Sequence, residues 1–195
     1  MDRESLFAGE NGEDLFKAIK NAREVLDKAF LDQFDRSLPF NEVLFDRWER
    51  AKALNFGEGT SIYDNVLVFG KPTIGKDVWI GPFSIIDGSG GLLIGDNVTI
   101  SSGVHIYSHD NVKQTLLGKD FPIEKANVEI GNNTYIGPNV VISKNVSIGH
   151  HCVVATNSFV NKSFPNNSIL AGNPAKKIGE VIIENNQVEF KYSRD

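Results

Sequence analysis

The sequence predicts an all-β solenoid, a parallel β-helix of six-residue repeats with a helical segment before it and a β-hairpin after it. Three observations predict this fold. An aliphatic residue recurs at every sixth position, glycine often follows it, and a small or β-branched residue stands four positions further on, as in IGKDVW and IGNNTY. Six residues are too few for an amphipathic helix, but they suit a short strand followed by a turn.

The repeat runs in three stretches, separated by the glycine-rich DGSGG segment and by a long interruption. The aliphatic positions are Ile62, Val68, Ile74, Ile80 and Ile86, then Ile94, Ile100, Ile106 and Val112, and then Ile130, Ile136, Ile142, Ile148, Val154 and Val160. Three repeats close one triangular coil of about 18 residues, which stacks Ile62 near Ile80 and Ile136 near Val154. We interpret Gly88, Gly90 and Gly91 as residues that accommodate a two-residue bulge.

Three parts are expected along the chain. Residues 1–55 form a helical segment, because apolar residues recur at helical spacing over residues 12–34 and 41–54, with Pro39 between them. Residues 56–178 form the β-helix, from which residues 107–129 project as a loop. Residues 179–195 form the hairpin, in which EVIIENNQVEF holds two β-rich runs about an Asn-Asn turn. The helices and the hairpin cover the exposed edges of the end coils.

The projecting loop is long, and loops of more than about 12 residues in a compact domain are functional or disordered. Phe121 and Pro122 favour an ordered loop here.

Composition excludes several classes of protein. The net charge of −5, with no run of Lys or Arg, argues against a general nucleic-acid binder. Cys152 is the single cysteine, which excludes an intrachain disulfide and fits a reducing compartment. No signal peptide and no stretch of about 20 apolar residues is visible, so we expect a cytoplasmic protein without a membrane span.

Residues 55–178 resemble the hexapeptide-repeat acyltransferases, in the branch of the maltose and galactoside O-acetyltransferases and the surface-polysaccharide acetyltransferases. The specific segments are IGDNVTISSGVHIYSHDN, IEKANVEIGNNTYIGPNVVI and VNKSFPNNSILAGNPAKKI. The resemblance implies a left-handed coil and a homotrimer with active sites between subunits. It also implies acetyl-CoA as the acyl donor and a sugar or glycan as the acceptor. We expect no metal.

The resemblance assigns a general base to His109, in the YSHDN segment at the start of the loop. Acetyl transfer to a hydroxyl group requires removal of its proton, which an imidazole can take up near neutral pH. His105 lies on the same coil, faces outward and is a candidate for the acceptor site. Asp87 is expected to orient an acceptor hydroxyl or the catalytic histidine, with a plain turn aspartate as the default. Phe83 is a candidate for stacking on a sugar, with subunit packing as the alternative.

For the donor, the resemblance implies a groove along the last coils. The matching candidates are Tyr135, Thr156, Asn161, Lys162 and Lys176, with Lys177 as a further one. Relatives often carry tryptophan at the position of Tyr135 and alanine-glycine at Thr156 and Asn157, so packing against the pantetheine is expected to differ. The lysines suit phosphate groups, although ordinary surface lysines are the alternative.

Three other functions compete with sugar O-acetylation. The same base and groove would serve N-acetylation of an amino sugar. The γ-type carbonic anhydrases share the repeat and bind zinc through three histidines, but the spacing of His105 and His109 does not match theirs.

His150 and His151 beside Cys152 suggest a metal cluster, yet adjacent histidines on a turn point apart, and we interpret them as corner residues. The last alternative is a trimeric scaffold without chemistry.

Overall fold

The computed structural model describes residues 12–193, which fall into two compact units divided between Asp46 and Arg47. The first unit contains α1 (Gly12–Phe34) and α2 (Phe40–Leu44). The predicted helix over residues 12–34 is confirmed, with Glu13 and Asp14 in its first turn, where negative charge is favourable.

The single helix predicted over residues 41–54 is wrong. Two helices occur instead, α2 and α3 (Arg47–Ala53). Helix α2 ends because the backbone of Phe45 is extended, with φ of −108° and ψ of 132°. Asp46, a residue type that favours helix N-caps, then precedes α3. Among residues 12–193, no helix is both long and apolar enough to cross a membrane.

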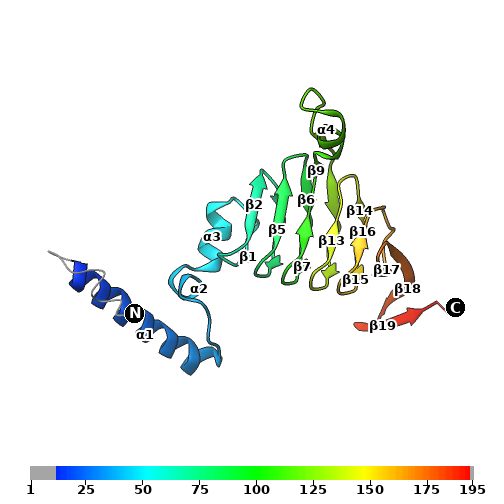
Figure 1. The fold of residues 1–195 in the computed structure, drawn as a ribbon. Helices are drawn as coiled ribbons and strands as arrows, with labels where there is room; N and C mark the ends of the chain where they lie inside the picture. Colours follow the sequence, from blue (N-terminus) through cyan, green and yellow to red (C-terminus); the bar gives the residue numbers. More distant parts are fainter. Residues whose placement is uncertain (1–11, 194–195) are drawn as a thin grey trace. The chain divides into compact units, whose positions relative to one another are not determined.

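The second unit is a parallel β-helix with three walls (Figure 1). The first wall holds β1 (Ser61–Ile62), β4 (Trp79–Ile80), β7 (Thr99–Ile100), β12 (Tyr135–Ile136), β15 (Val153–Val154) and β17 (Ser168–Gly172). The second wall holds β2 (Leu67–Gly70), β5 (Ile85–Gly88), β8 (His105–Ile106), β13 (Val141–Ile142) and β16 (Phe159–Val160). The third wall holds β3 (Thr73–Ile74), β6 (Leu92–Ile94), β11 (Val128–Ile130) and β14 (Ser147–Ile148).

The predicted stacking of the aliphatic positions is confirmed. Ile62 pairs with Ile80, and Ile136 pairs with Val154, in parallel register. Each of these four side chains is fully buried. The small or β-branched residue four positions further on also points inward, and Cys152 occupies one such corner. Burial of one such aliphatic side chain contributes about 1.5–3 kcal/mol, so the columns supply most of the stability of the coil.

Two segments cover the ends of the coil. Helix α3 packs against β1 and buries Ala51. At the other end, β18 (Ala175–Glu184) pairs antiparallel with β17 and with β19 (Gln187–Tyr192). The predicted hairpin is confirmed, and Asn185 and Asn186 take the positive φ angles of its two-residue turn. Its first strand already begins at Ala175, ahead of residue 179.

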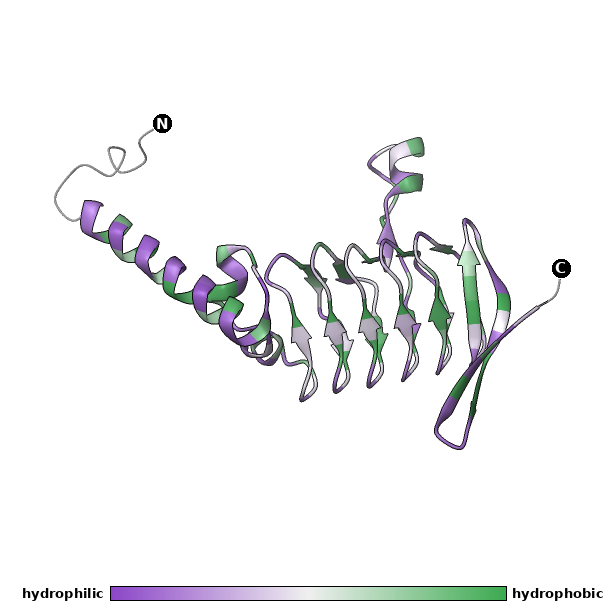
Figure 2. Cartoon of the chain, turned by 90° about the horizontal axis from the view of Figure 1, so that it is seen from below, coloured by the Kyte–Doolittle hydropathy of each residue, from purple (hydrophilic) through white to green (hydrophobic). Residues whose placement is uncertain are grey.

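The long interruption forms an ordered arm, residues 107–127, that projects from the stack of coils in both views (Figures 1 and 2). It contains β9 (His109–Asp110), α4 (Val112–Leu117) and β10 (Glu124–Lys125). The spacing predicted that Val112 is a core position of the repeat, and this prediction is wrong. Val112 begins α4 and is exposed. Residues 128 and 129 already belong to β11.

The corners of the coil favour asparagine, because their turns require positive φ. At the corner between the first and second walls, Asn139 and Asn157 have φ angles of 56° and 61°. Phe83 occupies the same corner two coils before Asn139, with φ of 61°, and the residue is 68% exposed. An exposed aromatic residue in the left-handed region is strained and has little burial to offset the strain.

We expect Phe83→Asn to stabilise the protein by about 1 kcal/mol, since asparagine tolerates the left-handed conformation that disfavours phenylalanine. Thermal unfolding of the variant checks this, with the melting temperature raised by a few degrees. Phe190→Asn is the control, because Phe190 is similarly exposed but lies in the regular strand β19. A lower melting temperature for Phe83→Asn would contradict the assignment of strain to this corner.

Candidate active site

A histidine and a buried carboxylate meet where the second wall passes into the arm. His109 is the first residue of β9, and its Nδ1 lies 2.6 Å from Oδ2 of Asp87, the third residue of β5. Asp87 is completely buried, whereas about a third of the His109 side chain is exposed. The carboxylate therefore lies behind the imidazole, which forms the exposed part of the pair.

Asp87 is held by further hydrogen bonds. The backbone N–H of Ser89 donates to Oδ1 at 2.9 Å, and the N–H and hydroxyl of Ser108 donate to Oδ2 at 2.8 and 3.1 Å. Burial alone would raise the pKa of Asp87, but these hydrogen bonds, those of Ser89 first, outweigh burial and hold the pKa well below its ordinary range. Since Asp87 is ionised, the proton between it and His109 lies on Nδ1.

The default interpretation of Asp87 as a plain turn residue is wrong. Its side chain faces the interior and contacts His109, and complete burial keeps it from contact with an acceptor hydroxyl. The contact with His109 is compatible with the other expected role of Asp87, which is to orient the histidine.

The glycine-rich segment after β5 supports this pair. Gly90 donates its N–H to the Ser108 hydroxyl at 2.8 Å, and a Cβ atom on Gly90 would lie 2.2 Å from the carbonyl oxygen of Ser108. Glycine is required there because the two backbone segments approach so closely. The glycine-rich segment thus does more than accommodate a bulge, since its Ser89 N–H binds the carboxylate and its Gly90 N–H binds the Ser108 hydroxyl. The repeat pattern alone gave no sign of this.

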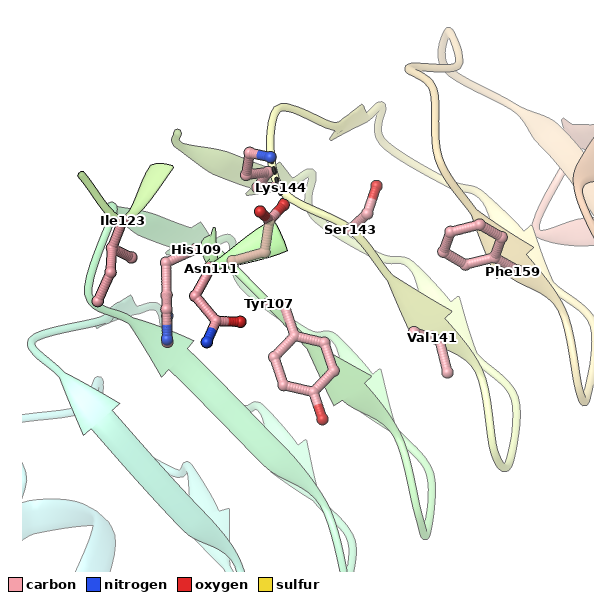
Figure 3. A pocket seen from close by; sticks show the side chains of 9 residues that line it. Tyr107, His109, Asn111, Ile123, Val141, Ser143, Lys144 and Phe159 are labelled. Atoms are coloured by element: carbon pink, nitrogen blue, oxygen red, sulfur yellow. Dashed lines mark hydrogen bonds and ion pairs between the residues drawn. The ribbon is translucent and has the colours of Figure 1, made fainter. Parts of the chain in front are cut away.

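His109 borders a pocket of about 490 Å³ on the outer face of the second wall (Figure 3). Val141 and Phe159 continue the outward row of His105 along β13 and β16, and Figure 3 shows them across the pocket from His109. The residues that line the pocket are Tyr107, His109, Asp110, Asn111, Ile123, Val141, Ser143, Lys144 and Phe159. Sequence reasoning found only His109 among them, although the outward register could have indicated Val141 and Phe159.

The charged groups of the pocket are paired. Lys144 forms an ion pair with Asp110, and its Nζ also lies 3.2 Å from Oε2 of Glu124 on β10. The hydrogen bond from Lys144 is the main cause that lowers the pKa of Asp110, and the same bond raises the pKa of Lys144. Apart from His109, the remaining lining groups are neutral hydrogen-bonding groups and apolar side chains.

The acceptor candidates His105 and Phe83 lie outside the lining of this pocket. His105 faces outward on β8, as expected, and its Nδ1 is 3.5 Å from the Tyr107 hydroxyl. Phe83 precedes β5, whereas His109 follows β8, so they lie at opposite edges of the second wall. Within one chain, Phe83 and His109 therefore do not form one site.

The donor candidates gather in the last coils. Tyr135 is exposed on the outer face of the first wall beside Thr99 and Val153. Thr156 occupies the corner after β15, and Asn161 and Lys162 follow β16. Lys176 and Lys177 lie on β18, where Lys177 pairs with Glu180 at 2.6 Å. Within one described chain, none of these side chains lines the pocket of His109.

His150 and His151 are corner residues, as interpreted. His150 Nδ1 accepts the N–H of Asn132 at 2.8 Å, and His151 lies 3.2 Å from the amide of Asn133. Cys152 points inward, and burial raises the pKa of its thiol. Residues 12–193 contain no group of three or more His, Cys, Asp or Glu side chains arranged to hold a metal ion.

The β-helix and the repeat pattern define a class of hexapeptide-repeat proteins, and comparison with known proteins supports this. The family model described as bacterial transferase hexapeptide (six repeats) matches residues 127–162. The model for the hexapeptide repeat of succinyl-transferase matches residues 73–108.

Among curated relatives, the putative lipopolysaccharide biosynthesis O-acetyl transferase WbbJ of Escherichia coli K12 is 30% identical, over 65% of this chain and 71% of the relative. Galactoside O-acetyltransferase of Escherichia coli K12 is 34% identical, over 51% of this chain and 46% of the relative. The chain thus spans about half the length of that second relative.

Among solved structures, AntD, an N-acyltransferase from Bacillus cereus in complex with dTDP and 3-hydroxybutyryl-CoA, superposes with a TM-score of 0.58. It is 28% identical, and the match covers 64% of this chain and 71% of AntD. The chain belongs to the hexapeptide-repeat acetyltransferase family.

Proposed function

We propose that the protein is an acetyl-CoA-dependent O-acetyltransferase that acts on a hydroxyl group of a sugar or glycan. The observation that carries this proposal is the pair formed by the ionised, buried Asp87 and the partly exposed His109 at the wall of a pocket. The relatives support it, because two of them are named as O-acetyltransferases and AntD was solved with an acyl-CoA.

His109 is the general base in this proposal. Asp87 holds Nδ1–H, which leaves Nε2 to take the proton of the acceptor hydroxyl. The hydroxyl oxygen bonds to the thioester carbonyl carbon, the carbon-sulfur bond breaks, and the coenzyme leaves as a thiol with the proton from Nε2. Asp87 stabilises the imidazolium that exists between these two proton transfers.

A homotrimer with active sites between subunits would complete the site. The donor candidates lie in the last coils and do not line the pocket of His109 in the same chain, so a second subunit is needed to bring an acyl-CoA to the histidine. Lys162, Lys176 and Lys177 would bind its phosphates, and Tyr135, Thr156 and Asn161 its pantetheine. We place this reaction in the cytoplasm.

The pocket favours a hydroxyl acceptor over an amine. An amino sugar carries a positive charge near neutral pH and is best held by an unpaired carboxylate. Asp110 is the carboxylate among the described lining residues, and Lys144 already neutralises it. Asn111 and Ser143 offer neutral hydrogen bonds, and Ile123, Val141 and Phe159 form apolar walls suited to the faces of a sugar ring.

We expect the purified protein to release coenzyme A thiol from acetyl-CoA when a neutral sugar is supplied. Thiol release is measured with a panel of glucosides, galactosides and amino sugars, and mass spectrometry locates the acetyl group. Higher kcat/KM for amino sugars would favour N-acetylation instead. A folded trimer that does not bind acetyl-CoA would favour a scaffold, and stoichiometric zinc in active protein would favour a carbonic-anhydrase-like site.

A further inference from the structure

The base of the arm brings two carboxylates together. Strands β9 and β10 form a short antiparallel ladder in which Asp110 pairs with Glu124 and His109 pairs with Lys125. Like charges directly opposite each other on neighbouring strands are destabilising. The Asp110–Glu124 pair, which is next to the His109–Lys125 pair in this ladder, is therefore repulsive.

Lys144 compensates this repulsion from outside the arm. It follows β13 in the next coil, and its ammonium donates hydrogen bonds to both Asp110 and Glu124. Its side chain is 24% exposed, so solvent screens the contacts only in part. Lys113 on α4 binds the other oxygen of Glu124, and this contact is the first cause that lowers the pKa of Glu124.

The contact of Lys144 differs from the bonds within the arm. The Gln114 amide donates to the carbonyl of Phe121, which joins the arm to itself. Lys144 instead joins the arm to β13, whose outward Val141 lines the same pocket. It thereby ties the strand of His109 to the opposite wall of the pocket.

We propose that Lys144 is a positioning residue. It clamps the base of the arm against the next coil, and it neutralises the charge of the Asp110 carboxylate in the pocket. The structural part of this inference rests on the ion pairs alone, whereas its kinetic part also rests on the proposed function. Loss of the clamp would let the two carboxylates separate, which displaces Asn111 and Ile123 from the acceptor pocket. It would also leave negative charge beside the acceptor, which favours cationic acceptors.

The structural test is hydrogen exchange on the arm. Lys144→Met keeps the length of the side chain but removes its charge, and we expect amides of residues 108–126 to exchange about tenfold faster. Lys144→Arg keeps the charge and should exchange like the unaltered protein. The triple variant Lys144→Met/Asp110→Asn/Glu124→Gln removes the repulsion as well and should recover most of the protection. Lys17→Met is the matched control, since Lys17 forms an exposed ion pair with Glu13 on α1.

The kinetic test separates acceptor from donor. In Lys144→Met, KM for a neutral sugar should rise about tenfold, while KM for acetyl-CoA and kcat change less than about threefold. The ratio of kcat/KM for an amino sugar to that for a neutral sugar should increase. Lys144→Arg should restore both.

Unchanged exchange in Lys144→Met, or the same loss of protection in the triple variant, would overturn the clamp. Equal increases in both KM values would overturn the role at the acceptor. If no acyl transfer is detected in any variant while exchange behaves as expected, the proposed function fails and the clamp stands.

Discussion

Replacement of His109 by alanine should lower the rate of acetyl transfer by about 10²–10⁴-fold, the usual contribution of a general base. The reason is that Nε2 of His109 is the group available in the pocket to take the proton from a hydroxyl, because Nδ1 is held by Asp87. Thiol release from acetyl-CoA measures the loss. KM for acetyl-CoA should remain close to its original value, since the donor candidates lie in the last coils.

His151→Asn is the matched control for this experiment. His151 occupies a corner with φ of 55° where preceding coils carry Asn97 and Asn133, so asparagine fits the backbone and the variant should retain full activity. Both variants should elute as the same oligomer and melt within a few degrees of the unaltered protein. Full activity in His109→Ala would show that His109 is not the base.

Asp87→Asn should lower kcat by about 10²-fold or more with little change in either KM. The asparagine amide fits the same space, but it carries no charge to stabilise the imidazolium. Its N–H₂ group can also donate to Nδ1, which favours the tautomer with the proton on Nε2. His109 would then present the wrong nitrogen to the acceptor. The rate of thiol release at saturating substrates measures the effect.

Asp77→Asn is the control, because Asp77 stands at an exposed corner with φ of 55° where other coils carry asparagine. The pH dependence of stability gives a second measurement. The pKa of Asp87 is depressed in the folded protein, so its stabilisation is complete above its unfolded pKa of about 3.9 and is lost as pH falls through the folded value. The variant should lack this acid-dependent loss. A variant with unaltered kcat would contradict an orienting role for Asp87.

The core could be predicted from sequence because the repeat is local. Each aliphatic residue at every sixth position predicts its own burial, and Ile62, Ile80, Ile136 and Val154 all follow this rule. The failures occur where a residue fits the period by chance. Val112 has the right spacing and type, but it begins α4, since the chain has already left the coil at residue 107.

The site was predicted only in part, because its contacts depend on insertions. His109 could be singled out from the YSHDN segment, but its partner Asp87 lies 22 residues earlier, an offset set by the coil and the DGSGG insertion. Lys144 lies 34 residues after Asp110, on the far side of the arm. A period of six residues gives no information about contacts that span an irregular segment, so the sequence left the role of Asp87 open and did not single out Lys144.

The manner in which the arm leaves the coil bears on how acceptor choice could change over time. Strand β8 ends before the arm and β11 begins after it, yet β8 pairs with β13 and β11 with β6 in unbroken register. The pairing of the coils therefore does not depend on the sequence of the arm. A doubling of the arm's length costs only about 0.6 kcal/mol in loop closure. Asp87 sits on the coil and His109 at the very root of the arm. The part of the arm beyond His109 could be replaced by another sequence that admits a different acceptor, while Asp87 and His109 stay in place.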